Sequence, residues 1–178
     1  MFGKLVAFLV ITVASARDLY LFNKLDTDII VSITGKSDVS LGVGTEEIVS
    51  VSEEFQGRIV AKNADCKSEI CDSVVTLVEL TLNENVDFYD VSLISGFNLP
   101  VRVVARSSGF CREASCFNEN LLKSCPNENK VEVDGALVAC KYTSKLFAEC
   151  YEAISSDDES AIFNCRGQPK YNIIYEFV

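Results

Sequence analysis

Hydrophobic and polar residues alternate in short segments between Leu19 and Val104, which is the pattern of half-buried β-strands. Val, Ile, Phe and Thr dominate these segments, and Gly, Asp, Asn and Ser lie between them as turns. No long helical period interrupts the alternation, so the pattern predicts a β-sandwich. The expected strands cover residues 19–23, 29–34, 47–51, 57–62, 74–82, 88–93 and 101–106.

The run at residues 87–100, DFYDVSLISGFNLP, has the sharpest pattern in the chain. Its Gly-Phe-Asn-Leu-Pro end permits an unusual turn and stops further strand pairing. A strand here has two faces, which carry Phe88, Asp90, Ser92 and Ile94 on one side and Asp87, Tyr89, Val91 and Leu93 on the other.

The character of the chain changes between Cys111 and Cys165, where six of the eight cysteines lie among polar loops. We expect a small disulfide-rich lobe with one helix, capped by Thr143 or Ser144. One face of this helix would carry Leu146, Phe147, Cys150 and Ile154. Residues 171–178 alternate again and should return to the sandwich as a strand.

The first residues have the layout of a secretory signal peptide. Lys4 precedes an apolar run at residues 5–13, and Ala14-Ser15-Ala16 follows it. The run is too short for an ordinary membrane helix. We therefore expect residues 1–16 to be removed and residues 17–178 to form a secreted, extracellular product without a membrane span.

The chain has 26 acidic and 16 basic residues. Removal of residues 1–16 would take away Lys4 and leave a net charge of 15 − 26 = −11. Such a chain is repelled by nucleic acid and by anionic membranes, so we expect neither as a partner. The sequence has no histidine, which excludes catalysis by Ser-His or Cys-His pairs and leaves carboxylates as the candidate groups. We expect no cofactor and no metal. Nothing suggests an extended apolar seam, and we expect a monomer.

All eight cysteines follow Ala16, which in an exported chain predicts four disulfides and no free thiol. A zinc site is the alternative, but the close pairs have four intervening residues, as in Cys66–Cys71 and Cys111–Cys116, and no C-x-x-C pair occurs. Disulfides are the better interpretation. Sequence alone leaves many connectivities open.

The run at residues 87–100 resembles the D-F-Y-D-x-S-x-x-x-G-F-N-x-P core of the thaumatin-like proteins, a family of secreted defence proteins. The resemblance extends over the whole chain after residue 16. Further matching segments are Leu19-x3-Asn23, the GRIV run at 57–60, the TLVELTL run at 76–82, Cys125-Pro126, residues 142–150 and residues 171–175. It implies one thaumatin-like domain at 17–178, with a sandwich at 17–110 and 166–178 and the lobe at 111–165.

The chain departs from the family by having fewer cysteines. Leu25 and Glu176 stand where the first and last family cysteines are normally bonded to each other, and a small subdomain is missing after Cys140. By position, the resemblance implies the pairs Cys66–Cys71, Cys111–Cys165, Cys116–Cys150 and Cys125–Cys140.

Family members have an acidic cleft lined by one arginine, one glutamate and three aspartates. The resemblance places Arg58, Glu79, Asp90, Ser95 and Asp158 there, with Asp157 as the neighbouring alternative to Asp158. The residues themselves agree in part, because Glu79 lies opposite the apolar face of its expected strand and Arg58 could pair with a carboxylate. The alternative is that the carboxylates of Glu79 and Asp90 simply lie on a solvated face of the sheet.

Three functions follow from these residues and the resemblance. The first is a secreted antifungal defence protein that binds β-1,3-glucan or a related wall polysaccharide, with Phe88 and Phe97 as candidates for stacking on sugar rings. The second is an endo-β-1,3-glucanase with Glu79 as acid and Asp90 or Asp158 as nucleophile or base. The third is a non-catalytic scaffold that binds another protein. Ser95 weakens the enzymatic reading, because a cleft carboxylate is absent there.

Overall fold

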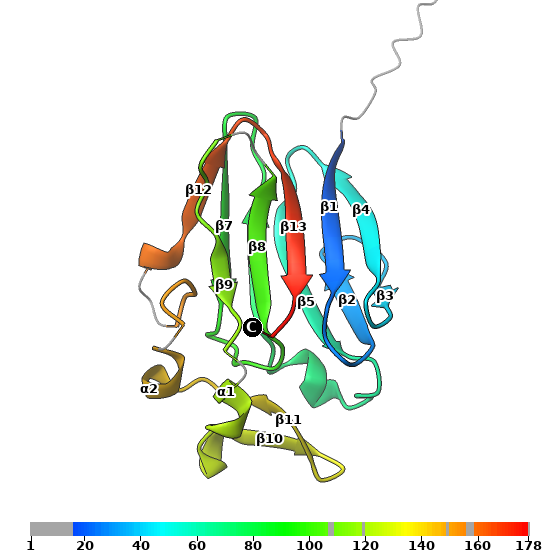
Figure 1. Cartoon of the computed structure of the whole chain (residues 1–178), viewed down its shortest axis with the longest axis vertical. Helices are drawn as coiled ribbons and strands as arrows, with labels where there is room; N and C mark the ends of the chain where they lie inside the picture. Colours follow the sequence, from blue (N-terminus) through cyan, green and yellow to red (C-terminus); the bar gives the residue numbers. More distant parts are fainter. Residues whose placement is uncertain (1–15, 107–108, 119, 149, 156–158, 178) are drawn as a thin grey trace, which may run out of the picture.

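The computed structural model describes residues 16–106, 109–118, 120–148, 150–155 and 159–177. Two sheets pack face to face as a sandwich, with smaller elements at one end (Figure 1). The five-stranded sheet has the order β4 (Glu46–Ser52), β1 (Ala16–Asn23), β13 (Lys170–Tyr175), β8 (Val101–Arg106) and β9 (Ala114–Cys116). The six-stranded sheet has the order β12 (Phe163–Arg166), β7 (Val86–Ser92), β6 (Leu77–Thr81), β5 (Gln56–Asn63), β2 (Ile29–Ile33) and β3 (Val39–Leu41). The expected sandwich is confirmed.

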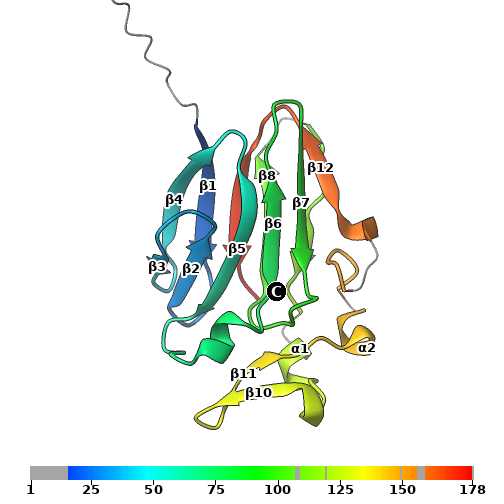
Figure 2. The ribbon, with the colours of Figure 1, turned by 180° about the vertical axis from the view of Figure 1, so that it is seen from behind.

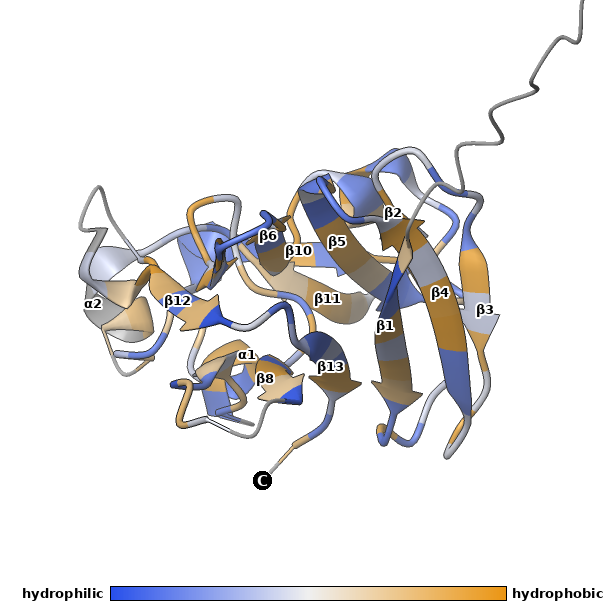
Figure 3. Cartoon of the chain, turned by 90° about the horizontal axis from the view of Figure 1, so that it is seen from above, coloured by the Kyte–Doolittle hydropathy of each residue, from blue (hydrophilic) through white to orange (hydrophobic). Residues whose placement is uncertain are grey.

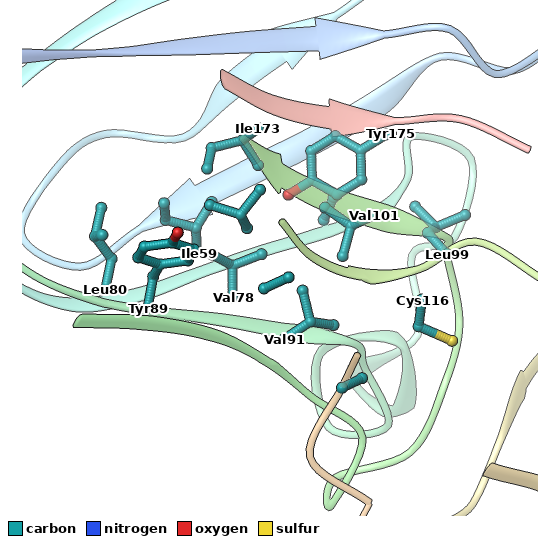
Figure 4. Packing of buried hydrophobic residues seen from close by; sticks show 14 of the residues in the cluster. Ile59, Val78, Leu80, Tyr89, Val91, Leu99, Val101, Cys116, Ile173 and Tyr175 are labelled. Carbon is teal, nitrogen blue, oxygen red and sulfur yellow. The ribbon is translucent and has the colours of Figure 1, made fainter. Parts of the chain in front are cut away.

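The period-two pattern of the sequence becomes the core of the sandwich. Every second residue of β1 is buried, and Figure 3 shows hydrophobic residues, in orange, along the strands of both sheets. Figure 4 shows the side chains that meet between the sheets, among them Ile59, Val78 and Tyr89 from one sheet and Val101 and Ile173 from the other. Hydrophobic burial between the two inner faces is therefore the main source of stability.

The first and last described strands lie side by side. β1 runs parallel to β13, whereas all other pairs in both sheets are antiparallel. Just beyond these strands, Lys24 Nζ lies 2.8 Å from Glu176 Oε2, and the Lys24 amide donates to the carbonyl of Tyr175. An ion pair thus joins the two segments at the place where the family resemblance implies a lost disulfide.

A buried ion pair joins the two sheets. Asp87 of β7 is 1 % exposed and accepts bonds from both Nη atoms of Arg17 on β1, which is itself 6 % exposed. The hydroxyl of Tyr171 on β13 donates to the same carboxylate at 2.9 Å, and the amide of Asn83 donates at 2.9 Å. Burial, and secondarily the nearby carboxylate of Asp87, raise the pKa of Tyr171, so its hydroxyl remains a donor. Asp87 therefore holds three strands from both sheets.

The turn that follows β7 is fixed by Gly96 and Asn98. Gly96 has a φ of 116°, and a Cβ on it would lie 2.6 Å from the carbonyl oxygen of Cys140. The amide group of Asn98 accepts from the backbone N–H of Thr76 at 2.9 Å and donates to the carbonyl of Ala61 at 2.8 Å. The sequence pattern of this turn therefore reflects a close approach of three backbone segments.

The elements at the end of the sandwich include a two-stranded ribbon, β10 (Lys130–Val133) and β11 (Ala136–Cys140), and the helical turns α1 (Asn120–Lys123) and α2 (Ser144–Phe147). Short 3-10 turns lie at Glu69–Asp72, Asn127–Asn129 and Glu159–Ala161. The four disulfides join Cys66–Cys71, Cys111–Cys165, Cys116–Cys150 and Cys125–Cys140.

The helix expected between residues 143 and 154 is much shorter than its apolar spacing indicates. Among the described residues of this range, only Ser144–Phe147 is helical, although Phe147, Cys150 and Ile154 are all buried as expected. Cys150 is bonded to Cys116, and Ile154 forms a bridge with Ser92 at the end of β7. These two attachments pull the chain out of helical geometry after one turn.

The region expected to form a lobe also builds the sandwich. β9 and β12 both lie within residues 111–166, and each forms an edge of a main sheet. The expected strand at 74–82 begins only at Leu77, because the backbone N–H of Thr76 is bonded to the side chain of Asn98 and not to a neighbouring strand. None of the described helices has the length and apolar character needed to cross a membrane. Residues 1–15 of the expected signal peptide lie outside the described residues.

Asp87→Ala should lower the free energy of unfolding by about 3–5 kcal/mol, because it leaves Arg17 buried without its partner. Chemical denaturation of the variant measures this. Asp18→Ala is the matched control, since Asp18 pairs with Lys170 in an exposed position and its loss should change stability little. Equal effects of the two substitutions would contradict a central role for Asp87.

Candidate functional site

Three charged residues form one row on the outer face of the six-stranded sheet. Arg58 of β5 lies opposite Glu79 of β6, and Glu79 lies opposite Asp90 of β7. Such directly opposed positions have Cβ atoms roughly 4.5–5.5 Å apart. Figure 2 shows these three strands side by side, seen from the outer face. Strand register thus brings together three of the residues expected in the cleft.

Local contacts hold Arg58 in this row. Its backbone N–H donates to Oγ1 of Thr34 at 2.9 Å, and the preceding residue is a glycine, at which a Cβ would lie 2.6 Å from Cβ of Thr34. The guanidinium Nε donates to Oε1 of Glu79 at 2.9 Å. With side-chain exposures of 66 % and 37 %, this ion pair is open to solvent, and both groups can also contact a ligand.

Asp90 occupies a very different environment from Glu79, although the two are neighbours. It is 7 % exposed, and its Oδ1 atom is buried without a hydrogen-bond partner among the described residues. Burial, and secondarily the charge of Glu79, raise the pKa of Asp90 from 3.8 to about 7. The row therefore pairs an exposed carboxylate, bound by arginine, with a carboxyl group that holds its proton near neutral pH.

A shallow hollow of about 220 Å³ lies beside this row, lined by Gln56, Gly57, Arg58, Glu79, Leu80 and Thr81. It is smaller than the clefts of roughly 300–1,000 Å³ that enclose small ligands. A shallow, polar surface of this kind suits part of an extended polymer better than a whole small molecule. Among the residues that the structure describes, no three His, Cys, Asp or Glu side chains are placed to hold a metal ion.

Of the remaining expected residues that the structure describes, neither Ser95 nor Phe97 joins the row. Ser95 lies half-buried in the turn after β7, and Asp157 and Asp158 lie outside the described residues. The expectation that Phe97 contacts a ligand is wrong, because it is 0 % exposed and packs against Phe147 in the core. The backbone N–H of Phe97 donates to the carbonyl of Cys140, and the carbonyl of Phe97 accepts from the N–H of Cys140. This pairing turns the side chain inward. Phe88, the other stacking candidate, is 45 % exposed.

Gln56 and Thr81 line the hollow but were not expected in the site. The alternation along each strand is visible in the sequence and shows which face carries each residue. That the two residues lie next to each other follows only from the pairing of β5 with β6 in the structure. The sequence signal that could have found them is their spacing of two residues from Arg58 and Glu79, on the same faces.

Comparison with known families and sequences gives a consistent match. The model of the thaumatin family matches residues 30–152. Thaumatin-like protein 2 of Prunus persica is 32 % identical over 165 residues, covering 70 % of this chain and 67 % of that protein. A Prunus avium protein named glucan endo-1,3-beta-glucosidase is 32 % identical over 164 residues, covering 70 % of this chain and 66 % of that protein. The chain thus spans about two thirds of the length of these relatives.

Solved structures agree on the fold. The structure of a thaumatin-like xylanase inhibitor matches with a TM-score of 0.53 at 11 % identity, covering 88 % of this chain and 97 % of the inhibitor. A laminaripentaose-producing beta-1,3-glucanase in complex with laminaritetraose matches with a TM-score of 0.55 at 13 % identity, covering 81 % of this chain and 57 % of the glucanase. At these identities the similarity concerns the fold alone.

The environment of Asp90 predicts a dependence of stability on pH. Its pKa is higher in the folded than in the unfolded chain, so the folded state holds the proton longer and stability should fall as pH rises from about 4 to about 7. Asp90→Asn removes the buried charge without changing the shape. At pH 8.5 it should raise the free energy of unfolding by on the order of 1 kcal/mol, with little effect at pH 4. Thermal unfolding at both pH values measures this, and an equal effect at both would contradict it.

Proposed function

The chain belongs to the thaumatin family, and from that premise we propose that it is a secreted defence protein that binds β-1,3-glucan or a related wall polysaccharide. The observation that carries this proposal is the row of Arg58, Glu79 and Asp90 beside a shallow polar hollow. A relative at 32 % identity is named for action on β-1,3-glucan, which supports this choice of polymer.

The chemistry of the row suits a neutral, hydroxyl-rich ligand. Glu79 accepts hydrogen bonds, Arg58 donates them, and a protonated Asp90 can do either. Arg58 balances the charge of Glu79, and a proton balances that of Asp90, so the site carries little net charge in a strongly acidic chain. An anionic polymer would be repelled by the rest of the molecule, whereas a neutral glucan would not.

A second candidate function, weak endo-β-1,3-glucanase activity, is favoured by the contrast between the two carboxyl groups. Glycosidases use one protonated and one ionised carboxyl group, and neighbouring environments separate their pKa values. Here Asp90 is the group that holds a proton, so it would protonate the glycosidic oxygen, while Glu79 would act as nucleophile or base. These roles are the reverse of those expected from the sequence, because strand packing buries Asp90 and leaves Glu79 in contact with water.

Export and a monomeric state are part of the same proposal. Four disulfides are typical of proteins that fold in an oxidising compartment. The signal-peptide pattern at residues 1–16 supplies the route of export. Binding to a wall polymer would then take place outside the cell, where an antifungal defence protein meets its target.

Co-sedimentation of residues 17–178, with all disulfides formed, should show retention on insoluble β-1,3-glucan and not on cellulose. Glu79→Gln should weaken this retention by about tenfold or more, because it removes a charge-assisted acceptor and releases Arg58. Glu47→Gln, an exposed glutamate on β4 of the other sheet, is the matched control and should bind normally. Absence of retention by the unaltered protein would refute glucan binding and favour the role of a protein-binding scaffold.

Release of new reducing ends from soluble β-1,3-glucan tests the enzymatic candidate. Asp90→Asn should abolish the release, because an amide cannot supply the proton, and the rate should decline as pH rises through about 7. Activity that survives Asp90→Asn but is lost in Glu79→Gln would return the acid role to Glu79. Retention on glucan without any product would leave binding as the sole function.

A further inference from the structure

We propose, on the premise that the site binds glucan, that the polysaccharide lies across the strands along a second row of side chains: Gln56, Thr81, Phe88 and Asn164. This row runs directly beside the charged row on the same outer face. Gln56 lies opposite Thr81, Thr81 opposite Phe88, and Phe88 opposite Asn164. It therefore crosses β5, β6, β7 and β12, and its first two members line the hollow.

The polar members of this row have unused hydrogen-bonding capacity. Within the described part of the chain, the side chains of Gln56, Thr81 and Asn164 form no hydrogen bond with another residue. Gln56 and Asn164 are exposed, and Thr81 is half-buried. Amide and hydroxyl groups offer both donors and acceptors, which matches the hydroxyl groups of a sugar chain.

The outer face of the five-stranded sheet differs in this respect. There Ser50 donates to Asp18 at 2.9 Å, Lys170 donates to Asp18 at 2.7 Å, and the guanidinium of Arg106 lies 4.0 Å above the ring of Tyr20. Most of the polar and aromatic groups named there are thus paired with one another, whereas Oδ1 of Asn172 on the same face has no hydrogen-bond partner among the described residues. Unpaired groups in a row are a feature of the six-stranded sheet, where the candidate site lies.

Phe88 adds an apolar surface at the centre of the row. Phe88 is 45 % exposed, although the residues on either side of it in the strand, Asp87 and Tyr89, are buried. Leaving an aromatic ring in water is unfavourable, and a sugar ring stacked on it would remove part of that surface from water. The polar neighbours on both sides would hold the sugar hydroxyl groups while Phe88 contacts the apolar face of a ring.

The geometry gives the bound chain a direction and a length. Neighbouring strands lie roughly 4.8 Å apart, so the row extends over about 14 Å from β5 to β12. That length accommodates a short run of sugar units and not a single one. The polymer would therefore lie perpendicular to the strands, and affinity should rise with oligomer length until the row is covered.

Titration calorimetry with soluble β-1,3-linked glucose oligomers of increasing length tests this inference. Phe88→Ala should weaken the binding of longer oligomers by roughly tenfold, because about half of the ring is available for contact. Asn164→Ala should weaken it roughly two- to tenfold through the loss of a neutral hydrogen bond. Phe88→Tyr should bind like the unaltered protein. Ile48→Ala, which truncates a side chain 55 % exposed on the other sheet, is the matched control and should also bind normally.

The outcomes separate this inference from the proposed function. Binding that is weakened by Glu79→Gln, but equally strong in Phe88→Ala, Asn164→Ala and Ile48→Ala, would overturn the second row and leave the charged row as the whole site. Absence of binding by the unaltered protein would refute the proposed function itself, and the second row with it. Thermal unfolding of each variant checks its fold, and Asn164→Ala decides the question alone if Phe88→Ala is unstable.

Discussion

The buried contact between Arg17 and Asp87 is the constraint on which the arrangement of the two sheets depends. It joins β1 to β7 across the core, and Tyr171 of β13 bonds to the same carboxylate. A carboxylate at 1 % exposure is tolerated only when its oxygens are fully bonded, which fixes the relative position of all three strands. Hydrophobic burial drives the sheets together, whereas this pair allows one alignment of them.

The same strand that carries this anchor also carries the candidate site. Because side chains alternate along β7, Asp87 and Tyr89 point into the core while Phe88 and Asp90 belong to the outer face. The buried contact of Asp87 fixes the position of β7, and it therefore also fixes where Phe88 and Asp90 lie on the outer face. The surface on which we propose that glucan binds is built from paired strands and not from loops.

The balance of charge in the row links the site to the composition of the chain. In a protein with a net charge of −10, two further uncompensated carboxylates would add to the repulsion between like charges. Here Glu79 is paired with Arg58, and burial keeps a proton on Asp90 near neutral pH. The result is a polar surface with donors and acceptors but little net charge, which distinguishes it from an acidic patch that would attract cations.

The sequence by itself determined the class of fold, most strands of the first hundred residues and the face on which their side chains lie, because a period of two along a strand needs no knowledge of its neighbours. It missed the short strand Val39–Leu41 and began the strand Leu77–Thr81 three residues too early. The family resemblance added the disulfide pairs and the charged row. Only the tertiary structure decided the strand register that sets Gln56, Thr81, Phe88 and Asn164 side by side, since register depends on pairing between distant segments. It also decided that Phe97 is buried and that the helix ends at Phe147, because attachments to Cys116, Cys140 and Ser92 outweigh local preference. Burial, and with it the protonation of Asp90, likewise arises only when the sheets are packed.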